Sequence, residues 1–155
     1  MMIVRVEEAD RAYLIARMPE WIAAGFLFAL GVQLGRPDNS FALSHIYDVL
    51  ARMATEREWS TLALGIATLR FVSLILNGFF PVIRRITPAT RCLTAFASGC
   101  VWSALAIGFI VENNSIVGIV AHAGWGFLDF TYAVIVAHEA AGMLKGALNA
   151  AERRI

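Results

Sequence analysis

The feature that most constrains this chain is the clustering of its apolar residues into long segments almost free of charge. Residues 60–80, 93–111 and 116–136 contain only two charged side chains, Arg70 and Asp129. A bilayer span needs about 20 predominantly apolar residues, and an ion in hydrocarbon costs several kcal/mol. These segments therefore predict three membrane-spanning helices, because a helix satisfies every backbone N–H and C=O group within itself.

The composition of the whole chain supports the same class. Of the 155 residues, 59% are hydrophobic and 16% are charged, whereas an ordinary soluble domain has about 25% charged residues. A chain this short has too much surface per volume to bury so many apolar side chains in a water-facing globule. A net charge of +1 and two cysteines also argue against a nucleic-acid binder and a disulfide scaffold. The predicted partner is the lipid bilayer.

A fourth apolar segment, residues 21–34, is shorter than the other three. It has 14 residues without a charge, a length that fits a short span or a re-entrant or surface helix. We expect this helix to begin near Pro19, since proline suits a first helical turn, and to end at residues 35–37. The favoured interpretation is a span, so that residues 1–155 form a single all-α polytopic membrane domain with four transmembrane helices.

Residues 39–54 are patterned but too polar to span. Their apolar side chains recur at helical spacing, and Asn39 or Ser40 can cap the start; they are Phe41, Leu43, Ile46, Leu50 and Met53. This pattern predicts an amphipathic helix at the membrane interface or across the mouth of the bundle. The alternative is a plain connecting loop.

The basic residues of the loops predict the orientation. Residues 81–92 contain Arg84, Arg85 and Arg91 and no acid, whereas residues 112–115 contain no base. Positively charged loops stay in the cytoplasm. We therefore expect a multi-pass inner (cytoplasmic) membrane protein with both termini cytoplasmic. The first 20 residues have mixed charge and lack the order of a signal peptide.

The charged side chains inside the predicted spans suggest a cluster. Arg70 lies at the centre of its span, Asp129 is the only acid in a span, and His122 lies seven residues before it on the same helical face. We predict that Arg70 and Asp129 form a buried pair that fixes the docking of the second and fourth spans. The alternative is a small transporter or channel with a proton or ion path through all three residues. Docking is favoured, because arginine does not release its proton.

Other motifs are few. Gly31 and Gly35 form a GxxxG spacing, which lets helices pack closely. The sequence has no GxSxG, HExxH, P-loop or dinucleotide-binding motif. It therefore predicts no catalytic residues, no metal site, no cofactor and no enzymatic activity.

Several short motifs resemble those of small multi-span membrane proteins encoded by tailed bacteriophages and prophages. The likeness covers roughly residues 19–110 and rests on Pro19-Glu20-Trp21, Ser44-His45-Ile46-Tyr47, Leu50-Ala51-Arg52-Met53, Trp59, Leu64-Gly65, Leu69-Arg70-Phe71 and Asn77-Gly78.

The resemblance implies three roles. The protein would travel in the virion and insert in the host membrane during genome delivery, form a holin-like pore, or exclude competing phages. Such a protein is expected to work as a homo-oligomer or within a larger protein assembly. An accessory subunit at the edge of a membrane complex is a further alternative.

Overall fold

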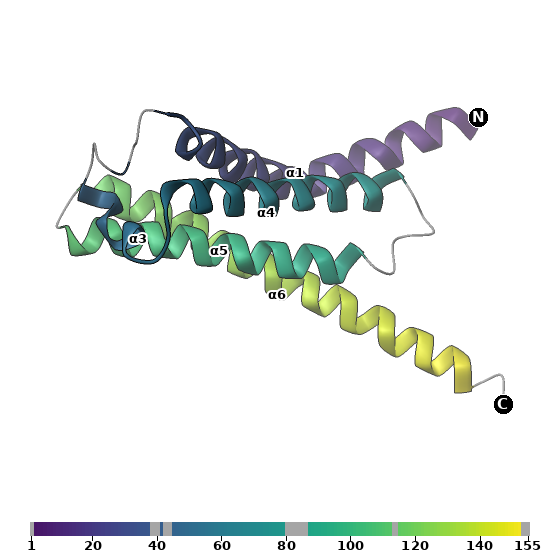
Figure 1. The fold of residues 1–155 in the computed structure, drawn as a ribbon. Helices are drawn as coiled ribbons and strands as arrows, with labels where there is room; N and C mark the ends of the chain where they lie inside the picture. The colour runs from purple at the N-terminus through teal and green to yellow at the C-terminus, as the bar shows by residue number, and fades with distance from the viewer. Residues whose placement is uncertain (1, 38–40, 42–44, 80–86, 113–114, 153–155) are drawn as a thin grey trace.

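The computed structural model describes residues 2–37, 41, 45–79, 87–112 and 115–152, and within these the chain forms helices and turns without a strand (Figure 1). The elements are α1 (Met2–Leu34), the 3₁₀ helix η1 (His45–Tyr47), α3 (Asp48–Ala51), α4 (Glu56–Phe79), α5 (Thr87–Val111) and α6 (Ile116–Glu152). Three helices are long and apolar enough to cross a membrane, over Glu56–Gly78, Thr87–Val111 and Ile116–Gly146. The all-helical class is confirmed, and three of the four predicted spans coincide with helices that are long and apolar enough to cross a membrane.

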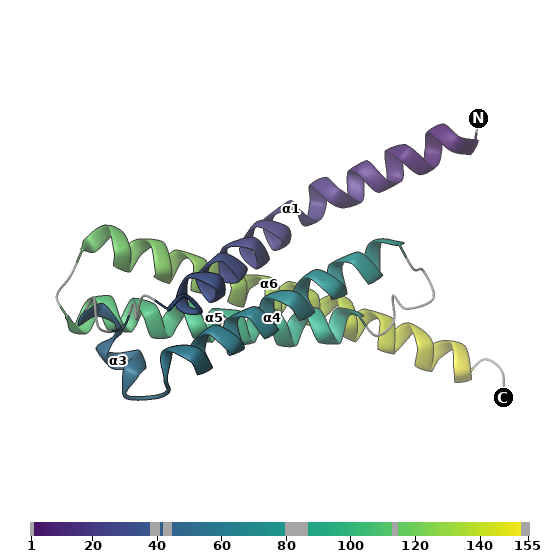
Figure 2. The ribbon, with the colours of Figure 1, turned by 45° about the horizontal axis from the view of Figure 1, so that its top comes forward.

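The long helices form an elongated bundle. α5 packs most extensively on α6, α4 lies between α5 and α1, and α1 meets α6 at few points. The start of α1, the end of α4, the start of α5 and the end of α6 lie at one end of the bundle (Figure 1). Figure 2 shows that the first half of α1 and the last part of α6 extend beyond this end and diverge. At 1.5 Å per residue, the 37 residues of α6 measure about 55 Å.

The first helix is longer than the sequence predicts. It begins at Met2, not near Pro19, and Pro19 lies inside it. A proline in a helix interior removes one hydrogen bond and displaces the carbonyl four residues earlier. Figure 1 shows the resulting change of direction in the middle of α1. Within the described residues, α1 is not among the helices long and apolar enough to cross a membrane.

The predicted interfacial helix at residues 39–54 is replaced, in its described part, by shorter pieces. η1 covers His45–Tyr47 and α3 covers only Asp48–Ala51; residues 38–40 and 42–44 lie outside the described chain. The indole of Trp59 donates a hydrogen bond of 3.0 Å to the carbonyl of Leu50. This bond holds α3 against the start of α4, so the chain turns where a continuous helix was expected.

The interior differs between the two halves of the bundle. The half near α3 is filled by an apolar cluster, whose fully or nearly buried members are Leu27, Leu34, Leu50, Trp59, Ala63, Ala67, Val101, Trp102 and Leu105. The other half contains most of the buried polar side chains, among them Glu20, Arg70, Asn77, Thr87, Arg91, Thr94, Ser98 and Asp129. The polar half lies toward the end where both termini are found.

Gly31 allows α1 and α4 to approach closely. A Cβ atom at Gly31 would lie 2.7 Å from Cγ and 2.9 Å from the backbone N of Leu64, and one at Gly35 would lie 2.8 Å from the Ser60 hydroxyl. The same hydroxyl donates a hydrogen bond of 2.7 Å to the carbonyl of Gly31. The GxxxG spacing therefore lies at the contact between these two helices.

We expect Gly31→Ala to destabilise the bundle by about 1–3 kcal/mol, because a backbone atom cannot move away as a side chain can. Gly25→Ala is the matched control on the same helix, since its Cβ would meet nothing within 4 Å. It should stabilise α1 by up to about 1 kcal/mol through helix propensity. Sodium dodecyl sulfate titration of the detergent-solubilised protein, followed by circular dichroism, measures both. Equal effects of the two substitutions would contradict this packing.

Candidate functional site

The first charged site lies inside the bundle, where Arg70 of α4 faces Asp129 of α6. Arg70 Nη1 lies 2.6 Å from Asp129 Oδ1, and the two side chains are 1% and 0% exposed. The hydroxyl of Ser98, on α5, donates a hydrogen bond to Asp129 Oδ2. Three helices therefore meet at one carboxylate, and the two residues singled out in the sequence are in direct contact.

The guanidinium of Arg70 is only partly satisfied by this pairing. Its three nitrogens are all buried, and none makes a hydrogen bond of acceptable geometry with a described residue, although Nη1 lies 2.6 Å from Asp129 Oδ1. An uncompensated buried charge is more costly than an uncompensated dipole. Removal of Asp129 should therefore be far more harmful than a typical single substitution.

His122 does not belong to this site. Its ring lies 4.7 Å from that of Phe109 and 5.6 Å from that of Trp102, measured between centroids. Its Nδ1 is 2.7 Å from the carbonyl of Gly118, one turn earlier on the same helix. The seven residues that separate His122 from Asp129 correspond to about 10 Å along α6. The structure thus brings together two of the three residues of the predicted cluster.

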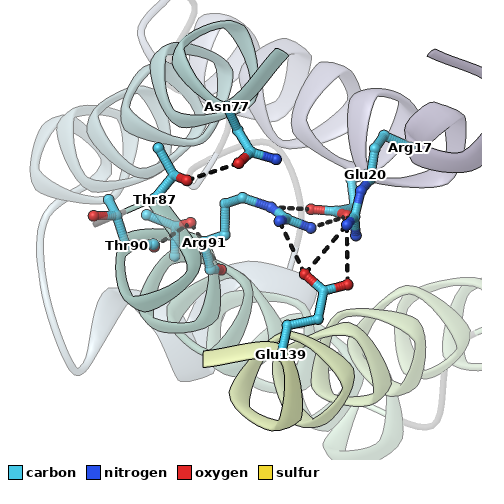
Figure 3. A network of polar contacts seen from close by, with 8 residues as sticks. Arg17, Glu20, Asn77, Thr87, Thr90, Arg91 and Glu139 are labelled. Atoms are coloured by element: carbon cyan, nitrogen blue, oxygen red, sulfur yellow. Dashed lines mark hydrogen bonds and ion pairs between the residues drawn. The ribbon is translucent and has the colours of Figure 1, made fainter. Parts of the chain in front are cut away.

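The second charged site joins four side chains, which we call the charge tetrad: Arg17 and Glu20 of α1, Arg91 of α5 and Glu139 of α6 (Figure 3). Arg91 holds Glu20 with two parallel bonds, from Nη2 to Oε1 at 2.6 Å and from Nε to Oε2 at 3.1 Å. A forked pair of this kind is the strongest geometry for an arginine–carboxylate contact.

The remaining bonds of the tetrad close it into a ring. Arg17 lies 3.1 Å from Glu20 and 2.9 Å from Glu139, and Arg91 Nη1 lies 3.3 Å from Glu139 Oε2. Each arginine therefore contacts both carboxylates, and the group is neutral as a whole. Arg91 and Glu20 are 1% and 3% exposed, whereas Arg17 and Glu139 are 20% and 32% exposed.

The carboxylates of the tetrad favour the charged form of Arg17, which precedes the apolar segment at residues 21–34. Burial lowers the pKa of its guanidinium, but the hydrogen bond to Glu139 and the charges of Glu20 and Glu139 more than offset this effect. The pKa of Arg17 therefore lies above its ordinary value.

The two sites occupy different depths along the bundle. From Ile116, Asp129 is 13 residues and Glu139 is 23 residues along α6, or about 20 Å and 35 Å. Along the axis of α5, counted back from Val111, Ser98 lies at about 20 Å and Arg91 at about 30 Å. The hydrocarbon core of a bilayer is about 30 Å thick. Counted from that end, the Arg70–Asp129 pair lies within the length of a hydrocarbon core, and the tetrad lies at about its full length.

A hydrogen bond continues the polar layer on the far side of Arg91. The hydroxyl of Thr87 donates to Oδ1 of Asn77 at 2.8 Å, and both residues are buried (Figure 3). Asn77 lies near the end of α4 and Thr87 begins α5. This end of the bundle is therefore held by polar contacts from all four long helices.

The sequence interpretation missed the tetrad. It used Arg91 as a loop residue for orientation and proposed no contact for Arg17, Glu20 or Glu139. A signal was present, because residues three apart on a helix lie on one face and Arg17 and Glu20 have this spacing. Their partners Arg91 and Glu139 lie far away in the sequence, so spacing alone could not identify them.

The described residues contain no group of three or more His, Cys, Asp or Glu side chains that could hold a metal ion. The fold and the two charged sites define a helical bundle with three candidate membrane spans, in which buried arginines and carboxylates pair between helices. Comparison of the chain with protein-family models, with curated proteins and with solved structures finds no match.

Proposed function

We propose that the protein is a non-enzymatic integral membrane protein in which buried ion pairs hold the helices together. The observation that carries this proposal is the pairing itself. Asp129 pairs with Arg70 from another helix, and Glu20 pairs with Arg91 from another helix. A guanidinium does not release its proton, so an arginine pair suits docking better than proton transfer. Paired charges are also the form in which ions are tolerated inside a bilayer.

The proposal includes four spans, with residues 21–34 of α1 as the fourth. Two observations support it. α1 packs along α4, one of the three candidate spans, and the end of α1 lies at the same bundle end as the end of α5 and the start of α6 (Figure 1). Four alternating crossings then place both termini on the side of the arginine-rich segment 81–92. By the positive-inside rule this side is the cytoplasm of the inner membrane.

The phage setting rests on the resemblance of residues 19–110 to small phage membrane proteins. Within that setting we propose a protein carried in the virion that inserts in the host membrane during genome delivery, with a holin-like role as the second possibility. Either role calls for copies of the chain, or other proteins, to assemble in the membrane. Mass spectrometry of purified virions tests the first role: the protein should be present at several copies per particle, and its absence would exclude carriage in the virion.

Two other functions are considered: a transporter or channel, and an accessory subunit of a larger membrane complex. A transporter or channel needs a path through His122, Arg70 and Asp129. The separation of His122 from the pair and its contacts with Trp102 and Phe109 do not favour such a path. Copurification of unrelated membrane proteins at fixed stoichiometry would favour the accessory subunit.

Proteoliposome flux separates docking from transport. With a pH-sensitive dye inside the vesicles, we expect the protein to give the same proton leak as empty liposomes. Asp129→Asn should leave this leak unchanged. A pH-dependent flux that the wild-type protein shows above empty liposomes, and that is lost in an Asp129→Asn variant shown to be folded by circular dichroism, would overturn the docking proposal.

A further inference from the structure

An open groove runs between α1 and α6 on the outside of the bundle. Its volume is about 310 Å³. Its walls are almost entirely apolar, and the lining residues are Ile15, Met18, Pro19, Ile22 and Ala23 of α1 and Trp125, Leu128 and Tyr132 of α6. The groove exists because these two helices meet at few points.

Both ends of the groove are defined by contacts between α1 and α6. At the end nearer the centre of the bundle, the rings of Phe26 and Trp125 lie 4.6 Å apart between centroids. At the other end, Arg17 reaches Glu139 at 2.9 Å. Trp125 and Tyr132 are seven residues apart, so the groove extends for about 10 Å along α6. We call this groove the slot; its apolar lining suits a hydrocarbon chain.

The walls of the groove face the surroundings of the bundle. Ile15, Met18 and Ile22 are 59%, 53% and 44% exposed, and the α6 wall belongs to the candidate span Ile116–Gly146. If the bundle crosses the membrane as proposed above, the surrounding medium is the hydrocarbon of the lipids. The occupant is then an acyl chain and not a soluble ligand.

The Arg17–Glu139 contact, which lies outside the lining of the groove, carries both signs of charge. Arg17 and Glu139 are the two partly exposed members of the tetrad, at 20% and 32%. Glu139 lies about 35 Å from Ile116 along α6, which is the depth of the headgroups across a core of about 30 Å. A lipid whose chain enters the slot would therefore place its headgroup beside this pair.

We propose that the groove binds one acyl chain of a zwitterionic aminophospholipid, with the phosphate at Arg17 and the ammonium at Glu139. Phosphatidylethanolamine fits both charges, because its ammonium can donate hydrogen bonds to a carboxylate. Phosphatidylcholine has the same charges but a trimethylated ammonium without an N–H donor. Phosphatidylglycerol has the phosphate without a cation and would face Glu139 with a like charge.

Native mass spectrometry of the detergent-solubilised protein tests this preference for one headgroup over the others. The probes are phosphatidylethanolamine, phosphatidylcholine and phosphatidylglycerol with identical chains. We expect phosphatidylethanolamine to bind about fivefold more tightly than phosphatidylglycerol, as one partly exposed ion pair would give. Glu139→Gln should remove this preference. Equal binding of the two lipids by the wild-type protein would overturn the headgroup assignment.

The slot itself is tested by filling it. Ile22→Trp places a larger side chain at its wall and should lower lipid retention, whereas Leu93→Trp is the matched control. Leu93 lines a separate apolar groove between α5 and α6 and is 65% exposed. Equal retention by both variants would overturn the site. Because Ile22→Trp could disturb folding, each variant is checked by circular dichroism and gel filtration.

Fluorescence quenching gives a measurement that starts from the wild-type protein. Phosphatidylethanolamine with brominated chains quenches nearby indoles, and Trp125 lines the slot. We expect quenching that saturates at one lipid per chain and is mostly lost in Trp125→Phe. Quenching that rises without saturation would contradict a defined site. If the protein does not fractionate with membranes, the proposed function fails as well; if it does, but shows no lipid order, only this inference fails.

Discussion

Replacement of Arg91 by leucine is expected to destabilise the bundle by about 3–5 kcal/mol, the usual cost of removing one partner from a buried ion pair. Arg91 is 1% exposed and makes three contacts, two with Glu20 and one with Glu139. Its loss leaves the tetrad with one arginine for two carboxylates. Since Glu20 is 3% exposed, water cannot replace the missing partner. Sodium dodecyl sulfate titration in detergent micelles measures the loss.

A double variant that restores the charge balance of the tetrad is the control for this prediction. In Arg91→Leu with Glu20→Leu the remaining pair is Arg17 and Glu139, which lie 2.9 Å apart. The double variant should therefore be more stable than Arg91→Leu alone. Arg57→Leu removes an exposed arginine at the start of α4 and should change the stability by no more than about 0.5 kcal/mol. If the double variant is less stable than the single one, the tetrad does not act as a balanced charge group.

The sequence was sufficient to predict the helices that depend only on the composition of their own segment. Apolar segments without charge are a property of the chain itself, and they appear in the structure as α4, α5 and α6. The pair of Arg70 and Asp129 could also be predicted, because each is the single ion in its span and a bilayer leaves such ions few partners. In both cases the free-energy cost of placing a charge in hydrocarbon leaves few possible structures.

The sequence was insufficient where the outcome depends on tertiary contacts. Pro19 usually marks a helix start, but the ion pairs of Arg17 and Glu20 with α5 and α6 hold the chain on both sides of the proline. The turn between α3 and α4 depends on a hydrogen bond from Trp59 to Leu50. The tetrad depends on Arg91 and Glu139, which are 48 residues apart. No local pattern encodes these contacts.

The two charged sites have different consequences for the position of α1. The Arg70–Asp129 pair, which we call the inner pair, joins α4 to α6 and does not contact α1. The tetrad joins α1 to both α5 and α6. α1 otherwise rests mainly on α4. Loss of the tetrad should therefore release α1 from α6 while α4, α5 and α6 stay together. Loss of the inner pair should affect these three helices directly.

The inner pair gives the second large effect, and the two single variants should differ. Asp129→Leu leaves a guanidinium that is 1% exposed and cannot become neutral, so we expect the upper part of the 3–5 kcal/mol range, about 5 kcal/mol. Arg70→Met leaves a carboxyl group, which can take up a proton and keeps its hydrogen bond from Ser98. Its cost should lie nearer 3 kcal/mol, at the lower end of about 3–5 kcal/mol. Denaturant titration at neutral pH measures this order.

The double variant Arg70→Met with Asp129→Leu completes the cycle. Replacement of a whole buried ion pair by apolar residues of similar volume is often neutral or stabilising, so the double variant should recover most of the stability lost in Asp129→Leu. The recovery should be larger in this bundle because Arg70 Nε and Nη2 have no hydrogen-bond partner among the described residues. Additive losses in the double variant, or a harmless Asp129→Leu, would show that Arg70 and Asp129 do not depend on each other for the docking of α4 on α6.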